Sequence, residues 1–173
     1  MTVVVVMGVS GAGKSTLAGM LAARLDWDLC EGDDLHPPEN IAKMAAGIPL
    51  TDADRKPWLE RIDAWIREHV DAGRSGIVTC SALKRSYRDI LTDGHDDVGF
   101  VYLKGSKNLI AGRLAARKGH FMPPQLLDSQ FKALEPPEPD EKALSVPIDA
   151  TVETIAENII RRLGLGYSAG GRK

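Results

Sequence analysis

The chain has 173 residues and a formal net charge of −2, with acidic and basic residues mixed along its length. This charge pattern argues against a nucleic-acid-binding surface and favours a small-molecule partner. The length suits one compact domain, which we expect over residues 1–164 before a disordered Gly- and Ser-rich tail at 165–173. The first apolar run, residues 3–7, is too short for a signal sequence or a membrane span, so we expect neither.

Strand and helix patterns alternate along the chain, which is typical of a doubly wound α/β sheet. The first strand is a β-branched run at residues 3–6, and leucines at every fourth position after Ser15 predict a helix packed on it. Further strands are expected at residues 28–30, 76–80, 98–103 and 144–148. Two later apolar stripes predict helices that end at Gly73 and before Gly119.

Both cysteines, Cys30 and Cys80, lie in apolar runs that we interpret as buried strand positions. Reduced, buried cysteines are typical of cytoplasmic proteins, and we expect this location, although one disulfide between the two stays an open alternative. The spacing of the histidines and cysteines does not indicate a transition-metal site.

Two proline-containing stretches, 33–56 and 118–139, interrupt the alternation. The first is rich in charge and has a short helical pattern at 41–45, so we interpret it as a substrate-binding insertion. The second encloses an amphipathic stretch with Leu127, Phe131 and Leu134, and we interpret it as a mobile lid.

The most specific motif directly follows the first strand. Residues 8–15 fit the phosphate-binding pattern G-x-x-x-x-G-K-[ST] in full, between a predicted strand and a predicted helix. Its glycines let backbone N–H groups converge on phosphate oxygens, and the helix N-terminus adds positive potential. We expect Lys14 to reach the β- and γ-phosphates of ATP and the Ser15 hydroxyl to bind Mg²⁺. The full set of expected nucleotide-binding residues here is Gly8, Val9, Ser10, Gly11, Ala12, Gly13, Lys14, Ser15 and Thr16.

An acidic residue for this site must come from an unusual place. P-loop motors and switch GTPases end a neighbouring strand with an aspartate, but the third and fourth strands here end without a carboxylate. Glu31-Gly32-Asp33-Asp34 follows the second strand, whose end shares an edge with the phosphate loop in a parallel sheet. We expect Glu31 to hold Mg²⁺ through water and Asp33 to orient the acceptor hydroxyl or take its proton, with Asp34 a solvated neighbour.

Several polar residues near the same edge are candidates for binding an anionic acceptor. Arg55 and Lys56 precede Pro57, which is tolerated in a first helical turn, and Ser81 and Lys84 start the helix after the third strand. Plain solvent exposure is an equally good explanation for Arg55 and Lys56, and an N-cap role is an equally good one for Ser81.

The lid region supplies further candidates. Arg113 and Arg117 are four residues apart on one helix face, where they repel each other unless an anion lies between them. With Lys118 they resemble phosphate clamps, and an exposed basic face is the alternative. His36 and His120 flank prolines; we include both as candidate substrate-binding residues, with a hydrogen-bonding role in a loop as the alternative.

Together these motifs resemble the bacterial-type gluconokinases of the P-loop class, relatives of shikimate and adenylate kinases. The matching stretches are 7–15 (MGVSGAGKS), 32–37 (GDDLHP), 40–44 (NIAKM), 52–59 (DADRKPWL), 80–84 (CSALK) with 87–89 (YRD), and 113–121 (RLAARKGHF). The resemblance covers about residues 3–160. It implies ATP-dependent phosphorylation of D-gluconate at its 6-hydroxyl, a five-stranded parallel sheet flanked by helices, a mobile lid and a homodimer.

The resemblance also implies roles for single residues. Arg113 is expected to pack on adenine, Arg117 to touch phosphates, and Asp33 and Arg55 to hold the acceptor. Lys14, Mg²⁺ and the lid arginines would stabilise in-line transfer, so we take Lys14, Asp33 and Arg117 as the catalytic set. Glu31 stands where the family pattern has aspartate, which leaves the metal geometry open.

Two other functions stay open at this point. One is a P-loop kinase for another small anionic acid or polyol such as shikimate, because many kinases share this fold and loop. The other is a nucleotide-binding module without transfer activity. The intact set of Lys14, Ser15 and Asp33 argues against the second alternative.

Overall fold

The computed structural model describes residues 1–116 and 124–165 of the chain. Within these ranges the strands form one sheet in the order β2-β3-β1-β4-β5, and each neighbouring pair is parallel. The strand bounds are β1 Val3–Met7, β2 Asp28–Glu31, β3 Gly76–Thr79, β4 Val98–Lys104 and β5 Ala143–Pro147. The five-stranded parallel sheet is therefore confirmed, and every strand begins and ends within about one residue of its expected bounds.

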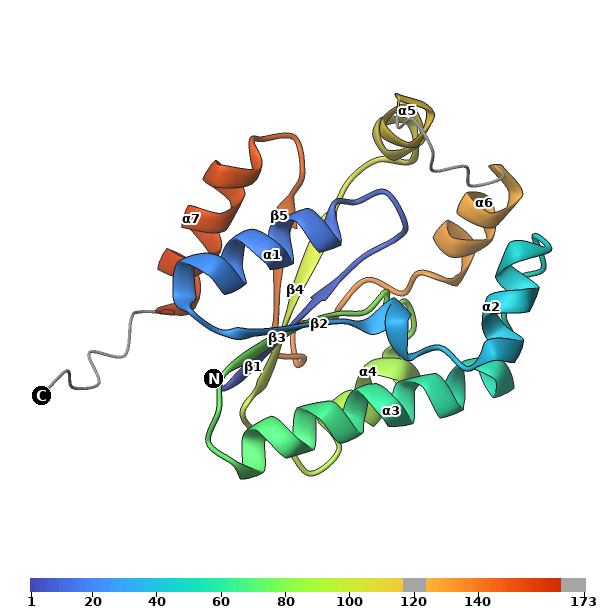
Figure 1. The fold of residues 1–173 in the computed structure, drawn as a ribbon. Coiled ribbons are helices and arrows are strands. Elements are labelled where there is room, and N and C mark those ends of the chain that lie inside the picture. The colour runs from blue at the N-terminus through green and yellow to red at the C-terminus, as the bar shows by residue number, and fades with distance from the viewer. Residues whose placement is uncertain (117–123, 166–173) are drawn as a thin grey trace, which may run out of the picture.

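Helices cover both faces of the sheet, and β1 is therefore buried on both sides. Val4 and Val6 belong to an apolar cluster with residues of α1 and α7, whereas Val3 and Val5 belong to a second cluster with residues of α3 and α4. Figure 1 shows the resulting three layers, and it shows α2, α5 and α6 beyond the end of the sheet where β1 enters the phosphate loop. The helix bounds are α1 Lys14–Leu25, α2 Pro38–Ala45, α3 Asp52–Asp71, α4 Arg85–Thr92, α5 Lys107–Ala116, α6 Pro124–Ala133 and α7 Val152–Leu163, and a short 3-10 helix, η1, spans Gly32–Leu35.

The edge strand β2 departs from the expected burial. Cys30 is only partly buried and Leu29 is 43% exposed, because β2 has a neighbouring strand on one side only. The prediction that Cys30 is a buried position was therefore wrong, whereas Cys80 is buried, which raises the pKa of its thiol to about 12. Both cysteines are free thiols, so the disulfide alternative was also wrong.

Helix α3 begins earlier than the sequence pattern indicated. Thr51 accepts a hydrogen bond from the Asp54 backbone N–H at 3.1 Å, and the Asp54 carboxylate accepts one from the Thr51 backbone N–H at 2.9 Å. This capping box starts the helix at Asp52 and leaves Pro57 inside it rather than in its first turn. Arg55 thus lies one turn into the helix, facing the end of the sheet.

The structure describes all of the irregular stretch 33–56 and part of the stretch 118–139. Residues 33–56 contain most of η1, all of α2 and the start of α3, and α6 lies within the expected lid at 118–139. Of the lid, residues 118–123 lie outside the described residues, as do residues 166–173 of the expected tail. Leu165, the first tail residue, is buried. Across residues 1–116 and 124–165, no helix is both long and apolar enough to span a bilayer.

Candidate active site

The phosphate loop joins β1 to α1 in the conformation that its glycines allow. Gly11 and Gly13 have φ angles of 82° and 95°, which residues with a side chain rarely adopt. The Lys14 ammonium group folds back over the loop and donates hydrogen bonds to the Gly8 and Val9 carbonyl oxygens, both at 3.0 Å. The loop therefore directs one positive charge and the N-terminus of α1 to a single point, as a phosphate site requires.

Glu31 lies at the end of β2, beside this loop. Its Oε2 atom accepts hydrogen bonds from the Ser15 hydroxyl at 2.9 Å and from the Thr79 hydroxyl at 2.8 Å. The structure thus brings together the two residues that the sequence assigned to the metal. Thr79 was missed as their partner, although its position at the end of β3, next to β2, was a usable signal.

These side chains fit a magnesium ion chemically. Mg²⁺ prefers oxygen ligands and usually combines one or two protein groups with water and substrate phosphates. Ser15 and Glu31 offer a hydroxyl and a carboxylate oxygen within hydrogen-bond distance of each other, next to the phosphate loop. Glu31 reaches this position despite being one methylene longer than aspartate.

Gly32 lies between Glu31, the candidate metal residue, and Asp33, the candidate acceptor residue. A Cβ atom at this position would lie 1.9 Å from the Thr79 carbonyl oxygen, so only glycine permits this close packing of η1 on β3. The Gly32 backbone N–H also donates to the Thr79 hydroxyl at 3.1 Å. This contact fixes the turn that carries Asp33, whose side chain is 84% exposed.

A cavity of about 280 Å³ opens between the phosphate loop, η1, α3 and α6. Its polar lining includes Lys14, Asp33, His36, Arg55 and Ser81, as the sequence predicted. We call this cavity the acceptor pocket. The remaining lining residues are Ser10, Met44, Ile48, Pro49, Leu50, Trp58, Leu83, Leu126, Ser129 and Gln130.

Arg55 is held in the acceptor pocket by a polar cluster between α3 and α4. Its Nη1 atom donates to the Tyr87 hydroxyl at 3.0 Å, and that hydroxyl in turn donates to the Asp52 carboxylate. The hydrogen bond from Tyr87, with another from Lys84 at 3.0 Å, lowers the pKa of Asp52. The cluster holds one terminal nitrogen of the Arg55 guanidinium group, and the residue lines the pocket.

Three predicted acceptor contacts have different positions. Lys56 is exposed and does not line the acceptor pocket, and Lys84 pairs with Asp52 outside it. Ser81 does line the pocket, but α4 begins at Arg85 with Lys84 at the N-cap position, so the N-cap alternative for Ser81 was wrong. The reason is that α4 begins three residues later than the pattern suggested.

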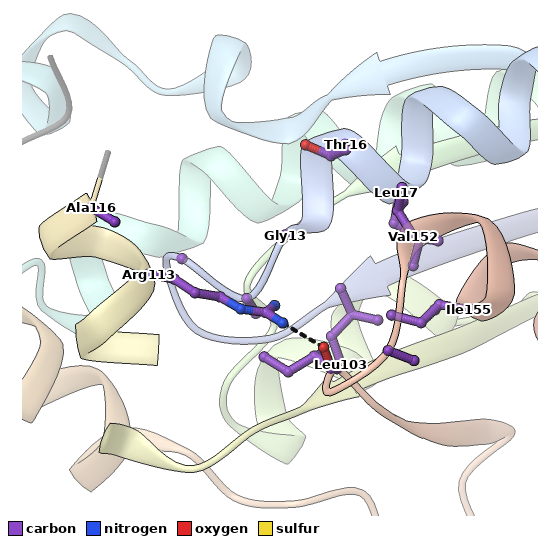
Figure 2. Close-up of a pocket in the computed structure, with 12 residues that line it drawn as sticks. Gly13, Thr16, Leu17, Leu103, Arg113, Ala116, Val152 and Ile155 are labelled. Atoms are coloured by element: carbon purple, nitrogen blue, oxygen red, sulfur yellow. Dashed lines mark hydrogen bonds between the residues drawn. The ribbon is translucent and has the colours of Figure 1, made fainter. Parts of the chain in front are cut away.

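A second cavity, of about 400 Å³, lies on the opposite side of the phosphate loop (Figure 2). Apolar side chains from α1, β4 and α7 form one wall, including Leu17, Leu103, Val152 and Ile155. Arg113 of α5 extends across the cavity and donates to the Ile148 carbonyl oxygen at 2.6 Å. Gly11, Ala12, Gly13 and Thr16 also line this cavity, so the phosphate loop separates it from the acceptor pocket. We call it the base pocket.

Helix α6 contacts the phosphate loop directly, through a residue that the sequence analysis missed. The Ser10 backbone N–H donates to Gln130 Oε1 at 2.7 Å, and Gln130 Nε2 donates to the Ser10 hydroxyl at 3.0 Å. Nothing in the local pattern of α6 distinguishes this glutamine from a solvated one, because its partner lies 120 positions away. The predicted site residues Arg117 and His120, with Lys118, lie outside the described residues.

Comparisons with known proteins agree with this geometry. A family model described as an AAA domain matches residues 3–137. The gluconokinase of Gluconobacter oxydans is 50% identical over 157 residues, which cover 91% of this chain and 88% of that relative.

Two solved structures are similar over nearly the whole chain. The unliganded structure of a sugar kinase from Janibacter sp. HTCC2649 has a TM-score of 0.90 and 46% identity, covering 96% of each chain. The structure of a gluconokinase from Sinorhizobium meliloti 1021 has a TM-score of 0.83 and 44% identity, covering 93% of this chain and 90% of that one.

Proposed function

The chain belongs to the gluconokinase family and is a kinase that phosphorylates gluconate, and we propose that ATP is the donor and the 6-hydroxyl the acceptor. One observation carries the assignment of sites: two cavities open on opposite sides of one phosphate loop. A nucleotide laid along the loop from the base pocket ends with its terminal phosphate beside the acceptor pocket. That is the arrangement that in-line phosphoryl transfer needs.

The base pocket supports binding of the adenosine part of ATP. Its apolar wall suits a purine, and Arg113 has its guanidinium group at the pocket edge. We assign adenine packing to Arg113 on this basis. The phosphates then lie against the backbone N–H groups of residues 8–15 and the side chain of Lys14.

Lys14 and Ser15 act on the transferred phosphoryl group and its neighbour. The Lys14 ammonium group, now on the Gly8 and Val9 carbonyl oxygens, is near enough to the loop to neutralise charge on the terminal phosphates. Ser15 and Glu31 would hold magnesium, Glu31 through water. When bound, the ion supplies further neutralisation of the phosphate charge during transfer.

The acceptor pocket supports an anionic sugar acid. Arg55 offers a fixed guanidinium group for the carboxylate of gluconate, and Ser81 offers a hydrogen bond to its hydroxyl groups. His36 lines the same pocket beside Asp33. Asp33 lies on the same wall as Lys14 and has an exposed carboxylate. We assign to Asp33 the orientation of the 6-hydroxyl and the acceptance of its proton.

The phosphate contacts of Arg117 and the acceptor contact of His120 rest on the family resemblance, as does a homodimer. Lys56 of α3 and Lys84 at the N-cap of α4 would reach the acceptor only after movement of those helices. A cytoplasmic location is consistent with the two free thiols.

The test compares two adjacent carboxylates. Asp33→Asn is expected to lower kcat by about 10²- to 10⁴-fold while ATP binding is retained, because the hydroxyl loses its proton acceptor. Asp34→Asn is the matched control, since Asp34 is exposed and does not line the acceptor pocket, and its kcat should stay near that of the wild type. Near-normal turnover of gluconate by Asp33→Asn, or equal loss in both variants, would refute the assignment.

A further inference from the structure

Asn40 of α2 is buried behind the acceptor pocket, with 3% of its surface exposed. Its Nδ2 atom donates a hydrogen bond to the Asp54 carbonyl oxygen at 2.9 Å and lies 3.2 Å from His36 Nδ1. A backbone carbonyl can only accept a hydrogen bond, so it determines which end of the Asn40 amide is the NH₂ group. The second hydrogen of that NH₂ group then points to His36 Nδ1.

This contact decides the protonation of the His36 ring. Because Nδ1 accepts from Asn40, the neutral ring must carry its hydrogen on Nε2. The ring is buried, and burial lowers the pKa of His36. Two charged groups face it: Asp33 of η1 acts in the opposite direction, and Arg55 of α3 adds to the lowering. The neutral ring with the hydrogen on Nε2 is therefore the favoured form near neutral pH.

The plane of the ring is fixed as well. His36 stacks on Trp58, with ring centroids 4.1 Å apart and an angle of 14° between the planes. Trp58 is 2% exposed, and its Nε1 atom donates to the Gly32 carbonyl oxygen at 2.7 Å. Gly32 belongs to the same turn as Asp33, so the ring and the carboxylate share one support.

The ring directs its Nε2 side to Asp33. His36 Nε2 lies 3.9 Å from Asp33 Oδ1, and both residues line the acceptor pocket. The Asp33 side chain is 84% exposed, so its carboxylate has room to change its orientation, and a closer approach would form a hydrogen bond with Nε2. One carboxylate oxygen would then be held by His36, and the other would stay available for the acceptor hydroxyl.

We propose that Asn40 is a positioning residue for phosphoryl transfer: it holds His36 with its hydrogen on Nε2, and His36 orients the Asp33 carboxylate toward the acceptor hydroxyl. The proposal rests on the function assigned to Asp33 above. A neutral His36 ring can orient the Asp33 carboxylate through a hydrogen bond. A charged imidazolium in the same place would make that carboxylate a weaker proton acceptor. With the hydrogen on Nδ1 instead, the Nε2 lone pair would face the carboxylate and repel it.

The first experiment measures the ring directly, without reference to activity. Long-range ¹H–¹⁵N spectra of the full chain at neutral pH distinguish the two neutral forms and the charged form of each of the four histidines. The His36 signals are assigned by their loss in His36→Gln. We expect a neutral His36 ring with its hydrogen on Nε2. A hydrogen on Nδ1, or on both nitrogens, would overturn the proposal.

The second experiment changes the partner of His36. In Asn40→Asp, a carboxylate of nearly the same shape attracts a hydrogen to Nδ1, so the spectra should show a ring protonated there or on both nitrogens. We expect kcat with gluconate to fall about 10- to 100-fold while KM for ATP stays within about 2-fold, as for other supporting residues. Glu39→Gln, at the exposed neighbouring position of α2, is the control and should leave kcat unchanged.

A change of protonation in Asn40→Asp without a fall in kcat would contradict the proposal. Thermal melts of both variants separate this effect from loss of folding. If Asn40→Asp does not fold, His36→Gln and His36→Leu replace it: glutamine keeps an N–H donor and leucine does not. We expect kcat at least about 5-fold higher for His36→Gln, and equal rates would refute the role of the donor. Absence of gluconate turnover by the wild type would instead contradict the proposed function.

Discussion

Glu31 is one methylene longer than the aspartate expected at its position, yet its Oε2 atom meets both the Ser15 and the Thr79 hydroxyls. The next residue, Gly32, lets the following turn pack tightly on the Thr79 carbonyl group. The residue that looked like a departure from the family pattern is therefore held by two hydrogen bonds at the metal side of the site.

Replacing Glu31 tests this role. Glu31→Gln keeps the shape of the side chain but removes its charge, so we expect the Mg²⁺ concentration for half-maximal rate to rise about 10-fold or more. Thr79→Val removes one supporting hydroxyl, and a smaller rise is expected. The measurement is a magnesium titration of the rate at saturating ATP and gluconate. An unchanged magnesium requirement in Glu31→Gln would exclude the carboxylate from metal binding.

Which single residues could be predicted depended on how local their signal is. Lys14, Ser15 and Glu31 follow strands whose ends must meet at one edge of a parallel sheet, so the sequence alone placed them together. Gln130 contacts this site from 120 positions away, and its neighbours in sequence do not mark it as special. Thr79 lies 48 positions from Glu31, and its place at the end of a strand was its one signal.

At the scale of elements, α6 lies in the described part of the expected lid, and Gln130 joins it to the phosphate loop. The Gln130 amide binds both the backbone N–H and the hydroxyl of Ser10, a residue that also lines the acceptor pocket. A neutral amide can do so without opposing the charge of a bound phosphate. The position of α6 is thus coupled to the loop that holds the nucleotide.

A change of charge at Gln130 tests the coupling between α6 and the phosphate loop. In Gln130→Glu a carboxylate faces the phosphate loop and repels ATP, so we expect KM for ATP to rise about 10-fold, with the effect reduced at high salt. Lys132→Gln is the control, because Lys132 lies on the exposed face of the same helix. Steady-state kinetics at two ionic strengths make the comparison. Equal KM values for ATP in Gln130→Glu and wild type would show that α6 leaves the loop before ATP binds.

The elements themselves were predictable to different degrees. The run at residues 3–6 favoured a strand buried on both faces, because four consecutive β-branched valines suit that environment. The start of α3 was misplaced because the Thr51–Asp54 capping box lies upstream of the apolar stripe. Burial of Cys30 was overestimated because strand order, which puts β2 at the edge, cannot be deduced from the strand's own residues.

At the scale of the whole molecule, the sheet places two pockets of different character on either side of one loop. The base pocket has an apolar wall, and the acceptor pocket is lined by Lys14, Asp33, His36 and Arg55. The positive charges of Lys14 and Arg55 favour an acceptor that is itself an anion. This asymmetry fits a kinase that transfers a phosphoryl group from a nucleotide to a small acid.

The most direct test is an ADP-release assay with ATP and a panel of acceptors: gluconate, shikimate, other sugar acids and a nucleoside. We expect turnover that is restricted to gluconate, or a kcat/KM for gluconate at least about 100-fold higher than for any other acceptor. The reason is that the acceptor must place a carboxylate at Arg55 and its reacting hydroxyl at Asp33 at the same time. Comparable turnover of another acceptor, or ADP release that does not depend on any acceptor, would contradict the account.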